Sequence, residues 1–298
     1  MNNIEIIEAF LAYLKDNKKV SSNTLSAYKR DIGAFGDFLE LNKKSFDCAC
    51  FEDISLYKDF LVNQGKSVAT VSRCMSSIRT FYKFLVATNQ CNSNPAAEVK
   101  NDKVEKKYFE ILTEDEIDRL LAAPDSSDFK GKRDRAMLEL LYATGMKVSE
   151  LLSLNVSDFN ARMHCISCKG STSANNRVIV LYPEAVKAIE DYINKARCFF
   201  VLNPNEQALF VNVNGERMTR QGFWKLLKIY ADMSGIRKSI TPHTLRHSFA
   251  THLLENGADI NDIKKILGHA DISSTMVYTN FIKSKTDTSY IKFNHRAK

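Results

Sequence analysis

The stretch that organises this chain runs from Thr241 to Tyr278 and reads TPHTLRHSFATHLLENGADINDIKKILGHADISSTMVY. Thr241 is a good N-cap, and Pro242 suits the first helical position because its missing N–H costs nothing there. His243 and Arg246 lie three residues apart, so they share one face of the predicted helix. The stretch therefore predicts a helix that presents a histidine and an arginine together.

An apolar stripe would seat this helix on a core. Its members recur at steps of three and four residues: Leu245, Phe249, Leu253 and Leu254. A second helix is predicted over residues 260–267, and Gly268 would end it as a left-handed cap that turns His269 out of the helical path. A third helix would carry Tyr278 within its first turns. These side chains would then meet around one small anion.

The histidines and cysteines also have simpler explanations. A lone histidine on a helix is more often a satisfied surface or core residue than a functional one. His243 and His247 lie four residues apart, as on a zinc-binding helix, but the glutamate of an HExxH site is absent. Cysteines are odd in number, seven, and the CxxC pair Cys165 and Cys168 has no second pair nearby. We therefore expect reduced thiols throughout, with Cys165 and Cys168 as strand residues, and no metal site.

The sequence holds one long, ordered motif: HTLRHSFATHLL, then LGH ending at His269, then Tyr278. This motif strongly resembles the C-terminal signature of the tyrosine recombinases, the phage-integrase family, and the resemblance covers nearly the whole chain. The two-domain length looks most like the Xer chromosome-dimer resolvases, whereas a mobile-element integrase shares the same motifs and stays an alternative. The resemblance implies a site-specific recombinase that cuts and rejoins DNA through a 3′-phosphotyrosyl intermediate, without metal, ATP or another cofactor.

The resemblance also implies a role for each residue of the motif. Tyr278 would be the nucleophile, because a phenolate can leave again when the strand is religated. Arg246 would clamp the phosphate with its two-pronged guanidinium, and His269 would donate to a non-bridging oxygen. His243 would hydrogen-bond the phosphate or accept the tyrosine proton. Lys169, which precedes a turn rich in Gly, Ser and Asn, would be the general acid for the leaving oxygen.

One position departs from the family pattern. The segment ATGMKVSELLSL matches the family's first box, where the residue before Val148 is usually arginine, but here it is Lys147. Lysine keeps the positive charge and loses the planar pair of donors. A charged hydrogen bond contributes roughly 1.5–3 kcal/mol, so its loss predicts a step about 10- to 150-fold slower. A DNA-binding homologue with a weakened catalytic site is therefore a second hypothesis.

Glu150 follows Lys147 by three residues, so the two would share a helix face. The resemblance implies that Glu150 is a carboxylate that orients the cations of the active site without contacting the phosphate itself. The alternative is an ordinary surface ion pair between Glu150 and Lys147.

The fold class indicated by the sequence is mainly α with a small β-sheet. Residues 1–100 show four apolar stripes typical of a helical bundle, and the resemblance implies a SAM-like core-binding domain that contacts DNA. Residues 101–108 are polar and lack periodicity, so we expect a linker there. Residues 109–298 would form a mixed α/β catalytic domain in which helices flank a small sheet. Strands are expected at residues 165–168, 177–181 and 208–211.

A net charge of +7 favours a polyanionic partner without establishing one. Four basic residues between the N-terminal apolar stripes could face a phosphate backbone, although a merely solvated face is an equally good interpretation. They are Lys29, Arg30, Arg73 and Arg79. No apolar run reaches the ~20 residues of a membrane span, and the N-terminus lacks the basic start of a signal peptide. We expect a soluble, cytoplasmic protein without a membrane partner.

The last segment, residues 286–298, carries three apolar side chains close to the terminus: Tyr290, Ile291 and Phe293. Such a cluster is more often a docked helix than a free end. The family passes a C-terminal helix to a neighbouring subunit, so the resemblance implies a homo- or hetero-tetramer on two sites of double-stranded DNA. An accessory activator protein is a further partner to expect.

Overall fold

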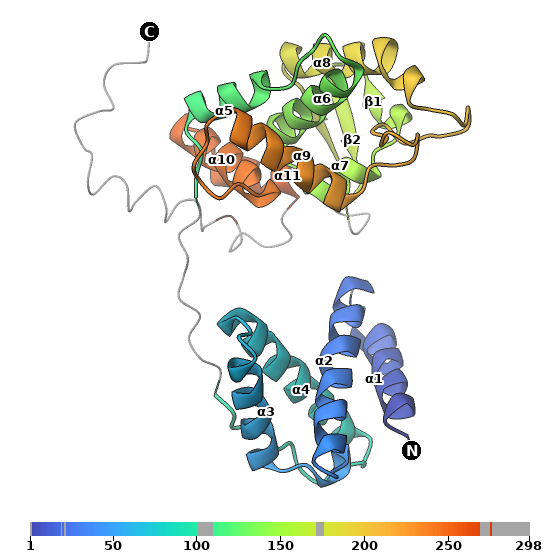
Figure 1. Cartoon of the computed structure of the whole chain (residues 1–298), viewed down its shortest axis with the longest axis vertical. Helices are drawn as coiled ribbons and strands as arrows, with labels where there is room; N and C mark the ends of the chain where they lie inside the picture. The colour runs from blue at the N-terminus through green and yellow to red at the C-terminus, as the bar shows by residue number, and fades with distance from the viewer. Residues whose placement is uncertain are drawn as a thin grey trace, which may run out of the picture. The chain divides into compact units, whose positions relative to one another are not determined.

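The computed structural model describes residues 2–18, 20, 22–100, 110–170, 176–268 and 275. The chain divides into two compact units, Met1–Lys107 and Tyr108–Lys298. Figure 1 shows helices in the first unit and helices around a small sheet in the second. The predicted fold class, mainly α with a small β-sheet, is confirmed. Within the ranges given above, no helix is both long and apolar enough to cross a membrane.

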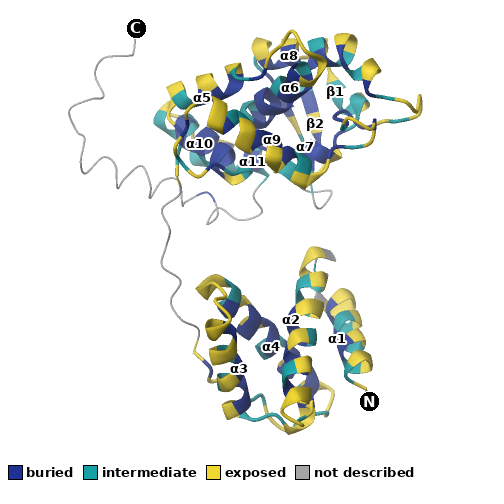
Figure 2. Ribbon diagram, viewed as in Figure 1, coloured by how far each residue is buried: buried dark blue, intermediate teal, exposed yellow. Residues whose placement is uncertain are grey.

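The N-terminal unit is built from α1 (Asn3–Lys18), α2 (Ser22–Leu41), α3 (Phe51–Asn63) and α4 (Val68–Ala87). Local capping sets the start of α4, because the Ser67 hydroxyl accepts a hydrogen bond from the backbone N–H of Thr70. The helices pack around buried aromatic rings, and the Tyr82 hydroxyl donates to the Phe46 carbonyl at 2.9 Å. In Figure 2 the buried residues of these helices face one another.

The C-terminal unit contains α5 (Glu114–Ala122), α6 (Phe129–Thr144), α7 (Val148–Ser153), β1 (Phe159–Asn160), β2 (Cys165–Cys168), β3 (Arg177–Val180), α8 (Pro183–Lys195), α9 (Arg220–Met233), α10 (Pro242–Glu255) and α11 (Ile260–Leu267). Its strands form an antiparallel sheet in the order β1-β2-β3, with Cys168 opposite Arg177. Side chains alternate across the sheet: Ile166 and Ile179 are buried, whereas Val178 is exposed. One face of the sheet therefore lies on the core.

Helix α6 supplies much of this core, and Figure 2 shows it as mostly buried. Its one buried glutamate, Glu139, accepts a hydrogen bond from the Tyr182 hydroxyl at 2.6 Å, so the carboxylate is not left without a partner. Gly145 ends α6 in the left-handed region, with φ +56°. A Cβ at Gly145 would lie 2.3 Å from the Phe249 ring, so only glycine lets α10 pack this closely on the end of α6.

The strand predicted at residues 208–211 is wrong. This segment makes only isolated bridges to described residues: Asn155–Ala208 and Val211–Arg217. The Ala208 carbonyl accepts from a side chain rather than from a strand, because Arg197 Nε and Nη2 donate to it at 3.1 and 2.7 Å. The sequence also gives no sign of β1, since two residues are too short to show alternation.

Candidate active site

Helix α10 begins as its sequence predicts. The Thr241 hydroxyl accepts a hydrogen bond from the backbone N–H of Thr244 at 3.1 Å, and Pro242 occupies the first turn. His243 is exposed, whereas Arg246, one turn further on, is buried. The helix therefore shows His243 to solvent while it holds Arg246 inside the unit.

Two backbone carbonyls fix the Arg246 guanidinium. Nη1 donates to the Gly145 oxygen, just after α6, at 2.6 Å, and Nη2 donates to the Leu267 oxygen at the end of α11 at 2.8 Å. The residue is only 4% exposed, so these charge-assisted hydrogen bonds offset part of its desolvation. Arg246 joins α6, α10 and α11, and its cationic group is thus held in place by the fold.

The end of α11 lies between two arginines. The Arg177 Nε donates to the Ile266 carbonyl at 2.6 Å, and Arg246 binds the next carbonyl, that of Leu267. Gly268 ends the helix with φ +65°, which confirms the predicted left-handed cap. Carbonyls left unpaired by a helix end attract cations, and the helix dipole adds to that attraction. The segment that leads to the predicted His269 is therefore anchored up to Gly268.

Glu150 is the third residue of α7, and its side chain is buried and ionised. Its carboxylate accepts a hydrogen bond from the backbone N–H of Lys147 at 2.9 Å, and from Arg177 at 3.0 and 3.3 Å. Burial alone would raise the pKa of Glu150, but these hydrogen bonds lower it below its ordinary value. With Glu150 only 8% exposed, the alternative of a surface pair with Lys147 is wrong.

The other predicted site residues differ in how firmly they are held. Lys147 is exposed at the N-cap of α7. Lys169 follows β2, and its side chain is 69% exposed; its Nζ lies 3.5 Å from a carboxylate oxygen of the largely buried Asp158. His269 and Tyr278 lie outside the described residues. Both lysines are therefore accessible to a phosphate.

Cys165 and Cys168 lie in β2, so their assignment to a strand is confirmed. Burial raises the pKa of the Cys168 thiol to about 11, which keeps it protonated at neutral pH. The rings of His243 and His247 are 6.3 Å apart. In the part of the chain that the structure describes, no group of three His, Cys, Asp or Glu side chains is placed to hold a metal ion.

The predicted DNA-facing residues of the N-terminal unit have different surroundings. Lys29 pairs with Glu8 at 2.5 Å, and both side chains are largely exposed. Arg73 pairs with the buried carboxylate of Asp31 at 2.5 Å, while Arg30 is exposed. The exposed Lys29–Glu8 pair contributes little to stability, whereas Arg73 also compensates a buried carboxylate. Lys29, Arg30 and Arg73 thus keep the exposure that contact with DNA would need.

Arg79 has an internal role. Its Nε donates to the Ala96 carbonyl at 3.1 Å, and its Nη2 donates to the Val99 carbonyl at 2.7 Å. These contacts tie the segment after α4 back onto the helix. A change at Arg79 would therefore loosen the end of the N-terminal unit, whatever it does to DNA binding.

Arg177 is the residue of this site that sequence reasoning passed over. It is the first residue of β3, directly after the turn that follows Lys169. An arginine beside a hairpin turn is usually a surface residue, and the contacts with Glu150 and Ile266 join positions far apart in the chain. Only the closed fold shows that Arg177 belongs to the site.

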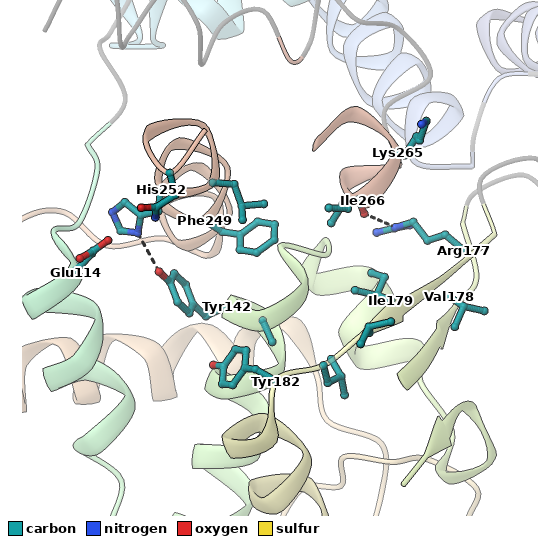
Figure 3. A pocket seen from close by; sticks show the side chains of 15 residues that line it. Glu114, Tyr142, Arg177, Val178, Ile179, Tyr182, Phe249, His252, Lys265 and Ile266 are labelled. Atoms are coloured by element: carbon teal, nitrogen blue, oxygen red, sulfur yellow. Dashed lines mark hydrogen bonds between the residues drawn. The ribbon is translucent and has the colours of Figure 1, made fainter. Parts of the chain in front are cut away.

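An apolar groove of about 810 Å³ lies beside these residues. It runs between β3, the end of α6, α10 and α11, and Figure 3 shows a polar group at each end. At one end the Tyr142 hydroxyl and His252 Nδ1 are 2.9 Å apart, with Glu114 nearby. At the other end Arg177 binds the Ile266 carbonyl. A segment with several apolar side chains could fill such a groove.

The sequence profile of the Phage integrase family matches residues 110–285, and that of the phage integrase N-terminal SAM-like domain matches residues 7–89. Among curated proteins, the chain is 45% identical to tyrosine recombinase XerD of Oceanobacillus iheyensis over 294 residues, which is 98% of both chains. It is 40% identical to tyrosine recombinase XerD of Staphylococcus epidermidis over 293 residues, or 98% of this chain and 99% of that one.

Three solved structures resemble the fold. The XerA recombinase is 28% identical, with a TM-score of 0.53 over 97% of this chain and 100% of that one. The Tn1549 transposon integrase in complex with a circular intermediate DNA has a TM-score of 0.75 at 18% identity, over 95% and 98%. The XerH recombinase bound to palindromic difH substrate has a TM-score of 0.71 at 21% identity, over 94% and 83%. At such identities the last two show the fold alone.

Proposed function

The chain belongs to the phage integrase family of tyrosine recombinases, and from this premise we propose that it is a site-specific DNA recombinase of the Xer type. It cuts and rejoins double-stranded DNA at paired sites in the cytoplasm and thereby resolves chromosome dimers. The observation that carries this proposal is 45% identity, over 98% of both chains, with a protein named tyrosine recombinase XerD. Because the second relative bears the same name, a mobile-element integrase is less well supported.

In the proposed reaction Tyr278 attacks the scissile phosphate. A bond forms between its oxygen and phosphorus while the bond to the 5′-oxygen breaks, which leaves a 3′-phosphotyrosine and a 5′-hydroxyl. Lys169 gives the leaving oxygen its proton, and His243 accepts the tyrosine proton or hydrogen-bonds the phosphate. Arg246 and His269 donate to the non-bridging oxygens as negative charge develops. A 5′-hydroxyl of the second duplex then reverses these steps, so strands are exchanged in turn through a Holliday junction.

The anchoring of Arg246 supports this mechanism. A group that stabilises developing charge is most effective when it needs no rearrangement during the reaction. Two carbonyls from α11 and the end of α6 already fix this guanidinium inside the unit. The Arg246 side chain therefore loses little further conformational entropy when a phosphate binds.

A nicked DNA substrate tests the proposed function. The target site is first selected from random DNA by its binding to the full-length protein. A nick beside the scissile phosphate then lets the cleaved fragment diffuse away, so a covalent protein–DNA complex should accumulate and survive denaturation. If only salt-sensitive binding is seen, without any adduct, the chain is a DNA-binding module. Relaxation of single duplexes without a need for two sites would instead indicate a topoisomerase.

Lys147→Arg is expected to accelerate adduct formation by about 10- to 150-fold, because it restores one charged hydrogen bond worth roughly 1.5–3 kcal/mol. The measurement is the single-turnover rate on the nicked substrate. Lys147 is exposed at the N-cap of α7, so the larger side chain fits without repacking. Binding without any adduct in both proteins would favour the second hypothesis, a homologue with a weakened catalytic site.

The proposed assembly is a homo- or hetero-tetramer on two DNA sites, in which residues 286–298 of one subunit occupy the apolar groove of the next. Three features support it: the groove is lined largely by apolar side chains, α11 contributes to that lining and directly precedes residues 269–298 in the sequence, and the terminal segment carries Tyr290, Ile291 and Phe293. Residues 286–298 lie outside the described part of the chain. An accessory protein that binds at this interface between subunits would activate recombination.

Removal of residues 287–298 tests the assembly. We expect the shortened protein to bind a single site normally but to pair two sites poorly. Without the segment that connects neighbouring subunits, the multivalent contribution to assembly on two sites is lost. Binding is measured by gel shift on one site, and pairing by the mobility of the two-site complex. Unchanged pairing and unchanged cleavage in the shortened protein would contradict the proposed exchange.

A further inference from the structure

The Arg177 side chain makes three hydrogen bonds to two different parts of the C-terminal unit. Its Nε donates to the Ile266 carbonyl at 2.6 Å, while Nη1 and Nη2 donate to the two carboxylate oxygens of Glu150 at 3.3 and 3.0 Å. Both charged side chains are about one-tenth exposed. A planar guanidinium can make this combination of contacts, whereas a lysine ammonium cannot match it.

The neighbouring Gly268 is shaped to fit this guanidinium. A Cβ built at Gly268 would lie 2.7 Å from Arg177 Nη1 and 3.1 Å from its Cζ. The φ of +65° already favours glycine at this cap, and the close approach of Arg177 is a second, independent constraint. The end of α11 is therefore built around the arginine rather than merely beside it.

Each contact of Arg177 reaches a segment that carries a proposed catalytic group. Glu150 also binds the backbone N–H of Lys147, which fixes the start of α7. Ile266 precedes Leu267, whose carbonyl binds the phosphate clamp Arg246. In the sheet, Arg177 of β3 lies opposite Cys168 of β2, the residue before Lys169.

Lys169 itself depends on this arrangement. Its only ion pair to a described residue is the 3.5 Å contact with Asp158, and its side chain is 69% exposed. The turn end of the β2–β3 hairpin, where Cys168 lies opposite Arg177, is then the firm support nearest to Lys169. A shift of a strand by an ångström would move Lys169 away from the leaving oxygen.

Resting on the proposed function, we propose that Arg177 is a positioning residue that anchors the β2–β3 hairpin to α7 and α11 and so places Lys169 to protonate the leaving 5′-oxygen. Arg177 acts through Glu150 and the Ile266 carbonyl, and it is not itself assigned a contact with the phosphate. The ionised state of Glu150 strengthens this anchoring, because both oxygens of a carboxylate accept from the two Nη groups without an O–H donor facing the guanidinium.

The test compares two nicked substrates that differ in one atom. In the first the leaving group is the natural 5′-oxygen, and in the second it is sulfur. A thiolate leaves without a proton at neutral pH far more readily than an alkoxide, because a thiol pKa is about 8.5. Misplacement by ~1 Å can slow a step by about 100-fold, so Arg177→Lys should cleave the oxygen substrate about 100-fold more slowly. On the sulfur substrate it should approach the rate of the unaltered protein.

Three further variants make the outcome clear. Lys169→Met should show the same pattern, and so should Glu150→Gln, which removes the partner of Arg177. Arg197→Lys is the matched control, because Arg197 also binds backbone carbonyls but lies outside the proposed site. It should leave the ratio of the two rates unchanged. Melting temperature and DNA binding are recorded for every variant, so a folding defect is recognised.

Two results would overturn the positioning role. One is equal slowing of Arg177→Lys on both substrates, which would mean a general loss of site structure. The other is an unchanged rate on the oxygen substrate. If the unaltered protein cleaves neither substrate, the proposed function itself has failed, and this outcome is distinct from the first two.

Discussion

Tyr278→Phe is expected to abolish the covalent adduct on the nicked substrate while DNA binding persists. Phenylalanine keeps the aromatic ring and removes the only oxygen that could attack phosphorus at this position. Removal of a catalytic nucleophile in other enzymes lowers the rate on the order of 10⁶-fold, so the adduct should fall below detection. The measurement is a denaturing gel of labelled DNA, accompanied by a gel shift for binding.

A second tyrosine provides the control. Tyr13 is half-buried in the N-terminal unit and makes no hydrogen bond through its hydroxyl to a described residue, so Tyr13→Phe should form the adduct at the normal rate. Persistence of the adduct in Tyr278→Phe would mean that another side chain attacks the phosphate. The adduct could then be digested, and the peptide that carries the DNA would identify that residue.

Those parts of the site that local sequence determines were predictable. Helix α10 starts where Thr241 and Pro242 indicate, because capping depends on residues within one turn. The end of α11 at Gly268 follows from a single glycine in the left-handed region. The family resemblance rests on the same stretch, and it predicted the family that the comparisons then showed.

Contacts between distant segments were not predictable in this way. Arg246 binds the Gly145 carbonyl, 101 residues away, and Arg177 binds Glu150 across 27 residues. No periodicity or capping signal reports such pairs, because they form only when the hairpin, α7 and α11 close together. For the same reason the sequence left a surface pair of Lys147 and Glu150 open as the alternative, which the burial of Glu150 excludes.

A similar limit explains the error at residues 208–211. Four consecutive buried residues fit a strand, yet a strand also needs a neighbouring backbone to pair with. Here residues 208–211 form only isolated backbone bridges, and the Ala208 carbonyl accepts from the Arg197 side chain. Apolar patterns show which residues are buried, but they do not reveal what satisfies their carbonyls.

The second large effect is expected for Arg246→Lys, which should slow adduct formation by about 10²- to 10⁴-fold. Lysine keeps one positive charge but loses the fork that can donate two hydrogen bonds to a phosphate. Two charged hydrogen bonds contribute roughly 3–6 kcal/mol together, and ~1.4 kcal/mol corresponds to one decade in rate. The single-turnover rate on the nicked substrate measures this loss.

The same substitution also weakens the fold, because Arg246 binds the carbonyls of Gly145 and Leu267. Arg197→Lys separates the two effects, since it too removes hydrogen bonds to backbone carbonyls, at a place away from the proposed site. Both variants should lower the melting temperature, and only Arg246→Lys should slow the reaction of the folded protein. Equal slowing in both would assign Arg246 to the fold alone, and the charge of the transition state would then need another clamp.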